Sequence, residues 1–446
     1  MSIYSGPNPN LRNRPNGVPN LAVPEGSPSL FIDFVNNNYA TVNNGIKTAR
    51  SNAMSLITFT RSTSAMYMGP NGFLQTAAIN QPRFDYSNYV NFNGTCSGIL
   101  IEEPRTNLIT YSNPNIWASG GVTATTNAGL APDGTNTAVL LTVKATNSAN
   151  SHYNAGFNVT STNTYTASIY AKANTISGWF AFILYSGTGN GARAWFNVAT
   201  GIIGTVQNDG LGTGANASIQ ALPNGWYRCS LTTTSNGSSG TLMWEIDESN
   251  ANQIYQNGGT AGQSIYFWGA QFELGAFPTS LIPTAGATAF RTADSAVLTN
   301  TNFSSWYTQS QGTFLLSFAR TPATNGNYSR LLPINGGGSI DFMELDALTP
   351  TVVGIYGQGI TFFGPGFSNI NTLNGSTVNA ATSYTSNIMK ISANGAAPQS
   401  TPYGVTAVAT SISLGSPTGN FYNGYIKQLT FFPTFLSNTS LQQITS

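Results

Sequence analysis

The sequence predicts an all-β protein made of two tandem β-sandwiches behind an extended N-terminal arm and a small β segment. Only 7% of the 446 residues are charged, against roughly 25% in typical soluble domains. Polarity comes instead from Asn, Ser, Thr, Gly and Gln, which favour turns and strand edges over helices. Many short segments alternate apolar and polar residues with a period of two, and turn residues separate them. This is the pattern of a sandwich or jelly roll.

Length and charge limit the class of protein. A chain of this length suggests roughly two or three domains. The net charge is +1 and there is no basic run, so we expect no nucleic-acid partner. No apolar run reaches the roughly 20 residues that span a membrane, so we expect no membrane insertion. Cys96 and Cys229 stand far apart, and they predict no disulfide framework.

The first 112 residues divide into two predicted units. Residues 1–29 are rich in Pro and Asn and predict an extended N-terminal arm, which is either a disordered tail or an arm that orders against a neighbouring subunit. Residues 30–112 predict a small β segment for attachment, because two strand-like runs precede the turn signal at 69–72. The first residues also lack the apolar stretch of a secretory signal. We therefore expect a protein made in a cytoplasm and released by cell lysis.

Residues 113–286 predict a jelly roll whose last strand is the QSIYFWGAQFEL run at 263–274. A strict period of two places Tyr266, Trp268, Ala270 and Phe272 on one face of this strand. The same period places Phe267, Gly269, Gln271 and Glu273 on the other face. Pro and Gly residues then predict a connector with a domain boundary near Pro283.

Residues 287–446 predict a second β-sandwich. It begins with the strand-like run GTFLLSFAR and ends with a short amphipathic helix. Leu436, Leu441 and Ile444 fit one face of that helix, and Ser437 fits its N-cap.

Several segments resemble proteins of tailed bacteriophages. The run TFTRSTSAMYMGPNGFLQTAAINQPRFDY, followed by GILIEEPRTNLITYSN, resembles the N-terminal segment of tailed-phage virion proteins. IYAKA, NGWYRCSLT and YFWGAQFELGAFPTSLIPT resemble phage relatives of carbohydrate-binding jelly rolls. The closing order of strands and helix resembles a laminin-G or concanavalin-type lectin sandwich.

The resemblance implies a virion surface protein that decorates the head or a tail appendage. Its expected partners are other phage virion proteins and a host-surface polysaccharide, and its expected assembly is a homo-oligomer, a trimer. It would be made in the cytoplasm of the host bacterium. Three alternatives stay open: a cement protein that binds no sugar, a polysaccharide depolymerase, and a bacterial secreted adhesin.

Few residues suit catalysis, so we expect no enzyme. His152 is the sole histidine and its polar surroundings predict a surface loop, whereas a Ser–His–acid triad and most zinc sites would need it. Glu245 with Asp247, and Glu344 with Asp346, each place two carboxylates on one strand face, as in glycoside cleavage. They superficially resemble the E-x-D-x-E strand of laminarinase-type glucanases, but Ser249 and Leu348 stand at the third position.

Exposed aromatic rings beside hydrogen-bonding side chains are the expected sugar-binding elements. Period-two alternation in ARAWFNV places Arg193, Trp195 and Asn197 on one polar strand face, with Trp195 as the stacking ring. The other candidates are Tyr170, beside Lys172, and the pair Gln271 and Glu273.

Two further groupings of charged residues are candidates for structural roles. Loop or strand-end carboxylates at Asp133, Asp247 and Asp341 are tentative calcium ligands, so calcium is a possible cofactor. Glu102 and Glu103 beside Arg105 predict either an ion-pair cluster that orients two modules or an exposed turn.

Overall fold

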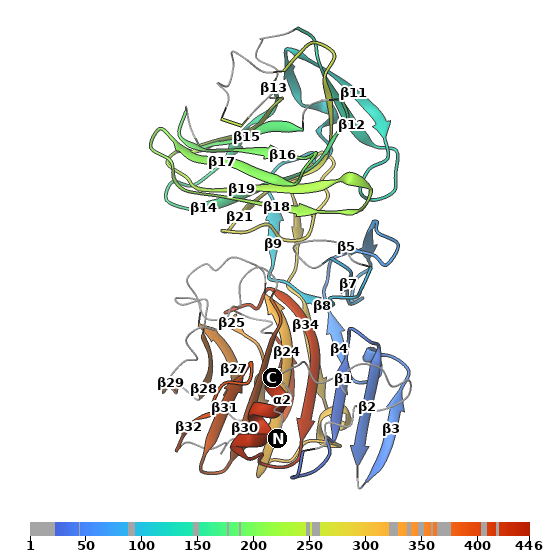
Figure 1. Ribbon diagram of the computed structural model, residues 1–446, viewed down its shortest axis with the longest axis vertical. Coiled ribbons are helices and arrows are strands. Elements are labelled where there is room, and N and C mark those ends of the chain that lie inside the picture. Colours follow the sequence, from blue (N-terminus) through green and yellow to red (C-terminus); the bar gives the residue numbers. More distant parts are fainter. Residues whose placement is uncertain are drawn as a thin grey trace, which may run out of the picture.

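The computed structural model confirms the all-β class, with 54% of residues in strands and 6% in helices. It describes residues 23–43, 45–87, 94–145, 151–175, 178–186, 189–246, 250–251, 259–320, 329–336, 340–346, 352–357, 360–363, 376–402, 408–415 and 419–446. Its antiparallel strands gather into two bodies joined by a narrow waist (Figure 1). None of the described helices is long and apolar enough to cross a membrane.

The upper body in Figure 1 is a sandwich of two six-stranded sheets, which we call the central sandwich. The strands of its first sheet are, in spatial order, β10 (Ala118–Gly120), β13 (Ser151–Asn158), β20 (Ser239–Ile246), β15 (Trp179–Ser186), β16 (Gly191–Asn197) and β17 (Ile202–Asp209). The strands of its second sheet are β11 (Val122–Gly129), β12 (Ala138–Val143), β21 (Ser264–Leu274), β14 (Thr164–Ala173), β19 (Tyr227–Thr234) and β18 (Thr213–Ala221). Between the sheets lies one apolar core that includes Phe180, Phe196, Trp244 and Phe267.

The lower body is a second sandwich, which we call the composite sandwich because both ends of the chain build it. Its first sheet runs β3 (Ile46–Arg50), β2 (Asn38–Asn43), β1 (Leu30–Asp33), β34 (Gly424–Phe432), β24 (Gln311–Arg320), β30 (Val378–Thr385), β31 (Met389–Ala393) and β32 (Gln399–Thr401), with β7 (Phe84–Asp85) and β8 (Gly98–Ile101) beside it. Its second sheet runs β29 (Ile360–Phe363), β28 (Val352–Gly357), β27 (Ile340–Asp346), β26 (Pro333–Gly336), β33 (Ala409–Leu414), β23 (Ser295–Thr299) and β4 (Thr58–Thr60), with β25 (Ser329–Arg330) on β27.

The strand pairing of the composite sandwich differs from the expected tandem division. Leu30 of β1 lies opposite Phe431 of β34, and Phe59 of β4 lies opposite Ala296 of β23. Residues of the N-terminal segment therefore share one apolar core with residues of the C-terminal block. The central sandwich is inserted within the composite one, because β1 and β34, which precede and follow it in the chain, pair directly in one sheet. The finer assignments, jelly roll and concanavalin-like, stay predictions.

Two adjacent crossings join the sandwiches. The outgoing strand β9 (Arg105–Asn107) pairs antiparallel with the returning strand β22 (Ala289–Arg291). A separate hairpin of β5 (Ala65–Met68) and β6 (Leu74–Ala77) lies next to this waist. Because two strands cross together, the sandwiches are held at two points of the chain.

A β-bulge in β21 corrects the predicted faces of that strand. Trp268 lies opposite Tyr170, but Gln271 lies opposite Ser168, so one extra residue stands in β21. Gly269 takes a φ of +64° there, a conformation that glycine adopts without strain. The prediction that Tyr266 and Trp268 share a face with Ala270 and Phe272 is wrong, because the strict alternation fails at this bulge. Phe267, Ala270 and Phe272 point into the core, whereas Trp268 belongs to a separate cluster on the outer side.

The short helices lie at turns and at the C-terminal end of the chain. They are α1 (Thr301–Ser304), α2 (Asn438–Thr445), and the 3-10 turns η2 (Ala53–Ser55), η3 (Pro114–Ile116) and η4 (Pro223–Gly225). The predicted C-terminal helix is confirmed as α2, with Ser437 as its N-cap and with Leu441 and Ile444 buried. From the expected arm, Glu25 accepts hydrogen bonds from Ser437 N at 2.9 Å and from Ser440 Oγ at 2.7 Å. The part of the arm before residue 23 lies outside the described residues.

Candidate functional site

The outer face of the second central sheet carries polar side chains in three rows. The pairing register aligns residues of β18, β19, β14 and β21 across the sheet. The rows are Gln220–Arg228–Tyr170–Trp268, Ser218–Ser230–Ser168–Gln271 and Asn216–Thr232–Thr166–Glu273. This face is polar because alternate residues of each strand point away from the apolar core. The sequence therefore provides a broad hydrogen-bonding surface on one side of the sandwich.

The connector after β21 covers one end of this polar face. Gln271 and Glu273 are fully buried beneath it. Gln271 Nε2 donates to the Thr279 carbonyl at 3.2 Å, and its Oε1 accepts from Ile282 N at 2.6 Å. Glu273 accepts from Thr279 N at 2.8 Å and from Thr279 Oγ1 at 2.7 Å. These two predicted sugar-binding residues instead hold the connector in place, so no surface on them is open to a ligand.

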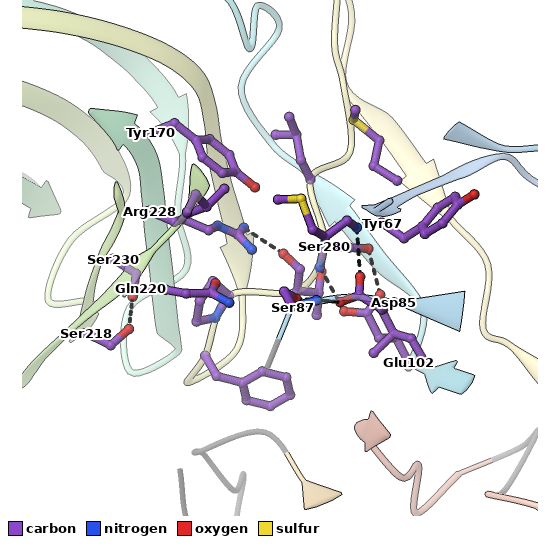
Figure 2. Close-up of a pocket in the computed structure, with 18 of the residues that line it drawn as sticks. Tyr67, Asp85, Ser87, Glu102, Tyr170, Ser218, Gln220, Arg228, Ser230 and Ser280 are labelled. Carbon is purple, nitrogen blue, oxygen red and sulfur yellow. Dashed lines mark hydrogen bonds between the residues drawn. The ribbon is translucent and has the colours of Figure 1, made fainter. Parts of the chain in front are cut away.

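The uncovered end of the polar face opens into a cavity of about 150 Å³, which we call the joint cavity (Figure 2). One wall is the polar face itself, with Gln220, Arg228 and Tyr170. The opposite wall comes from the segment beside the waist and includes Tyr67 and Asp85. The connector closes one side with Phe277 and Ser280, and Tyr425 of β34 also lines the cavity. Residues of both sandwiches thus meet at one site.

Tyr170 is buried in this cavity without a hydrogen-bond partner. Its side chain is 3% exposed, and Figure 2 shows its hydroxyl directed into the space between the two walls. Its ring packs edge-on against Trp268 at 5.6 Å between ring centroids. Burial raises the pKa of Tyr170, so its hydroxyl keeps its proton and stays a donor. Within the described part of the chain, Gln220 and Asn216 likewise line the cavity and make no hydrogen bond.

Arg228 lies beside Tyr170, and only some of its N–H groups make hydrogen bonds. Its Nη2 donates to Ser168 Oγ at 2.9 Å and to the Thr279 carbonyl at 2.6 Å. Its guanidinium carbon lies 5.5 Å from the centre of the Tyr170 ring, within the range of a cation–π contact. Its Nε is buried without a partner. The cavity therefore combines one cation with a free hydroxyl and two free amides.

The opposite wall contains a carboxylate, Asp85, that accepts four hydrogen bonds from the protein. Asp85 accepts from Met68 N at 2.9 Å, from Ser87 N at 2.7 Å, from Ser87 Oγ at 2.5 Å and from Tyr425 Oη at 3.2 Å. Burial raises the pKa of Asp85, although these donors and the nearby Arg83 favour its ionised form. Through these bonds Asp85 joins three chain segments, with three donors on Oδ1 and one on Oδ2.

An arginine–carboxylate cluster lies directly behind the cavity. It consists of Arg61, Arg83, Arg291, Glu102 and Asp294, and all five are at least 96% buried. Arg83 pairs with Glu102 at 2.6 Å and with Asp294, while Arg61 pairs with Asp294 at 3.0 Å. Arg291 pairs with Glu102 at 3.1 Å. Burial alone would raise the pKa of Glu102, but Arg291, Arg83 and two hydrogen bonds from Ser280 hold it well below its ordinary value.

The predicted grouping of Glu102, Glu103 and Arg105 is connected to this cluster. Arg105 pairs with Glu103, whose carbonyl accepts from Arg291 Nη2 at 2.9 Å. The grouping is therefore a buried ion-pair network at the boundary of the two sandwiches, and the expectation that it joins modules is confirmed. An exposed turn is excluded for Glu102, which is 4% exposed.

The strand with the predicted stacking ring lies on the other sheet, away from the joint cavity. Ala194, Phe196 and Val198 point into the core as expected. Trp195 is 2% exposed and packs with Ala181, Ile183 and Met243, so the exposed ring face that stacking requires is not seen there. Arg193 Nε donates to Asp209 at 2.6 Å, and Asn197 Oδ1 accepts from Ala199 N at 3.0 Å. Arg193 therefore joins two strands of its own sheet, and Asn197 stabilises the turn that follows its strand.

The predicted calcium ligands do not come together among the described residues. Asp133 Oδ1 accepts from Thr135 N at 3.0 Å and so forms a local turn. Asp341 lies in β27 opposite Pro333, and Asp247 lies outside the described residues. Among those residues no group of three or more His, Cys, Asp or Glu side chains is placed to hold a metal ion. Calcium binding stays a prediction.

Two of the residues weighed for catalysis, His152 and Glu245, are buried. His152 is fully buried, so the predicted surface position is wrong. Its ring packs beside the stacked pair of Trp117 and Trp244, with its centroid 6.1 Å from each of theirs. Its Nδ1 shares a hydrogen bond with Ser119 Oγ at 2.9 Å, and burial lowers its pKa. Glu245 is also fully buried. Glu344 and Asp346 belong to β27, and the Glu245–Asp247 pair is incomplete because Asp247 is not described.

A second cavity of about 440 Å³ lies between the β5–β6 hairpin and the returning connector. Met66, Leu281 and Phe290 provide much of its wall, and Phe290 is 54% exposed. Its sole charged residue, Arg291, is committed to the arginine–carboxylate cluster. It therefore offers fewer free hydrogen-bonding groups than the joint cavity.

Comparison with known proteins leaves the function to be argued from the chain itself. No family model matches, and no curated protein matches. The solved structures that resemble parts of the chain include a Ruminococcus gnavus IT-sialidase CBM40 bound to α2,3-sialyllactose, with 14% identity over 31% of this chain and 84% of that one, at a TM-score of 0.26. The binding domain of botulinum neurotoxin DC in complex with SialylT shows 11% identity over 34% of this chain and 39% of that one, also at 0.26.

A longer but equally distant similarity is to Trypanosoma rangeli sialidase in complex with sialic acid. It shows 10% identity over 68% of this chain and 60% of that one, at a TM-score of 0.27. Scores this low carry no argument about fold or ligand for this chain.

Sequence reasoning found Tyr170 but missed the residues around it. Arg228 in β19, and Gln220 and Asn216 in β18, become neighbours of Tyr170 only through the pairing register. The available signal was the alternation in GANASIQA and WYRCS, in which every second residue is polar. That pattern gives the faces of single strands and does not give the order in which strands pair.

Proposed function

We propose that this protein is a non-enzymatic component of a phage particle surface that binds a host-surface glycan in the joint cavity. The observation that carries the binding proposal is the Tyr170 hydroxyl, which faces the joint cavity on a buried side chain and makes no hydrogen bond within the described residues. Water or a ligand in the cavity can supply that missing hydrogen bond. A ligand rich in hydroxyl groups satisfies Tyr170, Gln220 and Asn216 at once.

The size of the cavity supports one sugar residue as its occupant. A cavity of about 150 Å³ accommodates a six-membered ring such as benzene, and the joint cavity is of that volume. A pyranose ring has similar dimensions, and its hydroxyls both donate and accept hydrogen bonds. We therefore propose that a terminal or branching sugar enters the cavity while the rest of the glycan stays outside.

The carboxylates of the cavity support binding over hydrolysis. Glycoside hydrolases place one carboxylic acid and one carboxylate on either side of the scissile bond, about 5–9.5 Å apart. The two carboxylates that line the cavity are Asp85, which accepts four hydrogen bonds, and Glu102, which is held by two arginines. The two arginines keep Glu102 ionised and paired, so Asp85, whose pKa burial raises, has no free carboxylate beside it to act as the nucleophile or base.

The virion part of the proposal is supported by the sequence. Its low charge and its resemblance to the N-terminal segments of tailed-phage virion proteins favour a surface protein that is made in the host cytoplasm. The particle-facing part would contact other virion proteins, either on the head or on a tail appendage, in a homo-oligomer such as a trimer. Immunogold electron microscopy of particles that contain this chain tests the location, and labelling of neither head nor tail contradicts it.

Binding of the purified full chain to an array of bacterial surface glycans tests the function. We expect saturable binding that weakens about three- to ten-fold in Tyr170→Phe, the change expected for one lost hydrogen bond. Tyr153→Phe is the matched control, because Tyr153 lies on the other central sheet and is 38% exposed.

The outcomes separate the alternatives. Binding that is the same in Tyr170→Phe and the unaltered chain places the glycan elsewhere, and binding to no glycan favours a cement protein. Release of reducing ends from a bound polysaccharide favours the depolymerase.

A further inference from the structure

Arg228 differs from the other arginines near the joint in having no carboxylate partner. Arg61, Arg83, Arg105 and Arg291 each form an ion pair with Asp or Glu. Arg228 forms none within the described part of the chain, and its only acceptors are the neutral Ser168 hydroxyl and the Thr279 carbonyl. Both acceptors use Nη2, so Nε and Nη1 have no acceptor among these residues.

The carboxylates around the cavity are already bound by other groups. Glu102 is bound by Arg83 and Arg291, and Glu273 is enclosed by Gln271 and Thr279 beneath the connector. Asp85 is surrounded by donors from Met68, Ser87 and Tyr425. Arg228 is therefore a cation of the cavity wall that has no ion-pair partner among the described residues.

The free groups around Arg228 suit an acceptor. The Tyr170 hydroxyl keeps its proton because burial disfavours the phenolate. The Gln220 amide next to Arg228 in the same row can donate two hydrogen bonds. An arginine with adjacent neutral donors is the arrangement by which proteins recognise carboxylate groups.

We propose that the sugar residue in the joint cavity is acidic and that its carboxylate pairs with Arg228, with Tyr170 and Gln220 as further donors. This inference rests on the proposed glycan binding and narrows it to uronic acids and other carboxylated sugars. The ion pair would compensate Arg228 in a partly buried site, where a charge-assisted hydrogen bond contributes more than a neutral one.

Titration of the full chain with paired ligands tests the proposal. The probes are an acidic oligosaccharide that ends in glucuronic acid and the same oligosaccharide after reduction of its carboxyl group to the neutral glucose form. We expect the acidic form to bind at least about ten-fold more tightly, with an advantage that shrinks as salt is raised from low to physiological concentration.

Two substitutions at Arg228 and one elsewhere separate charge from folding. Arg228→Gln should remove the preference for the acidic form, whereas Arg228→Lys should keep part of it because the positive charge remains. Arg193→Gln is the control, since that arginine lies on the other central sheet and already pairs with Asp209. Thermal unfolding of each variant shows whether the fold is kept.

Two results overturn the proposal in different ways. Equal binding of the acidic and neutral forms, or an acid preference that survives Arg228→Gln in a folded variant, overturns the acidic ligand but leaves glycan binding intact. Binding of neither form, nor of any glycan on the array, overturns the proposed function and this inference with it.

Discussion

The arginine–carboxylate cluster and the joint cavity are neighbours, and they differ in whether their polar side chains have partners within the protein. They share Glu102 and Ser280. In the cluster, three arginines and two carboxylates are paired with one another and with backbone carbonyls. In the cavity, Tyr170, Gln220 and Asn216 have no hydrogen-bond partner in the described chain, and Arg228 has no counter-charge.

The difference indicates which polar groups support the fold and which are left for a ligand. Charged groups removed from water are tolerated only when they are paired and hydrogen-bonded. Each charged group of the cluster has an ion-pair partner, while Nε of Arg83 and Nε of Arg291 make no hydrogen bond. Its chain segments come from residues 61–102 and 280–294, so pairing fixes the waist between the sandwiches. Cavity groups that have no protein partner stay open to water or to a ligand, and a ligand that pairs them gains affinity.

The largest expected effect comes from breaking the cluster. Arg83→Met leaves Glu102 and Asp294 with less compensation inside the protein, and we expect a loss of about 3–5 kcal/mol in the free energy of unfolding. Denaturant unfolding followed by tryptophan fluorescence measures it. Arg193→Met is the comparison, because Arg193 is 19% exposed and forms a single ion pair away from the waist, and we expect a smaller loss. Similar losses in both variants would contradict the special role of the cluster.

Acid should weaken the same cluster more than it affects the cavity. The pKa of Glu102 is held below its ordinary value of 4.5, so its contribution is fully present above about pH 4.5 and is lost as the pH falls from there. A single carboxylate of this kind contributes on the order of 2 kcal/mol. The free energy of unfolding, measured at a series of pH values across this range, should depend less on pH in Glu102→Gln than in the unaltered chain. A variant whose pH slope matches that of the unaltered chain assigns the acid sensitivity to other groups.

A change at the β21 bulge should have an intermediate effect that reaches the cavity. An alanine Cβ at Gly269 would lie 2.8 Å from the Tyr170 ring and 3.2 Å from Leu281, and its positive φ would cost a further 1 kcal/mol or so. We expect Gly269→Ala to lose about 1–3 kcal/mol and to weaken ligand binding. Gly262→Ala is the matched control, since Gly262 also has a positive φ but nothing within 4 Å. Equal binding by the two variants would show that Tyr170 does not respond to the bulge.

The smallest expected effect on stability comes from the cavity groups. Gln220→Ala and Tyr170→Phe remove groups that have no hydrogen-bond partner in the described chain, so the free energy of unfolding should change by less than about 0.5 kcal/mol. Ligand binding should nonetheless weaken. A loss of more than about 1 kcal/mol in either folded variant would mean that the group supports the fold, and the contrast with the cluster would disappear.

Local patterns predicted the all-β class and much of the local structure correctly. The alternation in ARAWFNV gave the buried side of β16, and the capping residue Ser437 gave the start of α2. These features depend on neighbours a few residues apart. The same reasoning also placed Glu102 and Arg105 at a module boundary, because charged residues are rare in this chain.

Features that depend on distant parts of the chain were not predictable. The sequence of β1 does not predict that Leu30 pairs with Phe431. A period of two does not predict the extra residue at Gly269. The polar neighbours of His152 in the sequence suggested that it was exposed. In the structure it packs against the rings of Trp117 and Trp244, which come from other segments of the chain. The joint cavity requires the register of β18, β19 and β14, so Tyr170 was found without the residues that act beside it.

The pairing of β1 with β34 also constrains the order of assembly during synthesis. Leu30 leaves the ribosome about 400 residues before its partner Phe431, so the composite sandwich stays incomplete until translation is almost finished. All strands of the central sandwich lie between residues 118 and 274, and their partners emerge together. The inserted sandwich can therefore form first while the early strands wait for the end of the chain. Those strands then need protection from aggregation by a chaperone or by transient contacts, since unpaired edges associate readily.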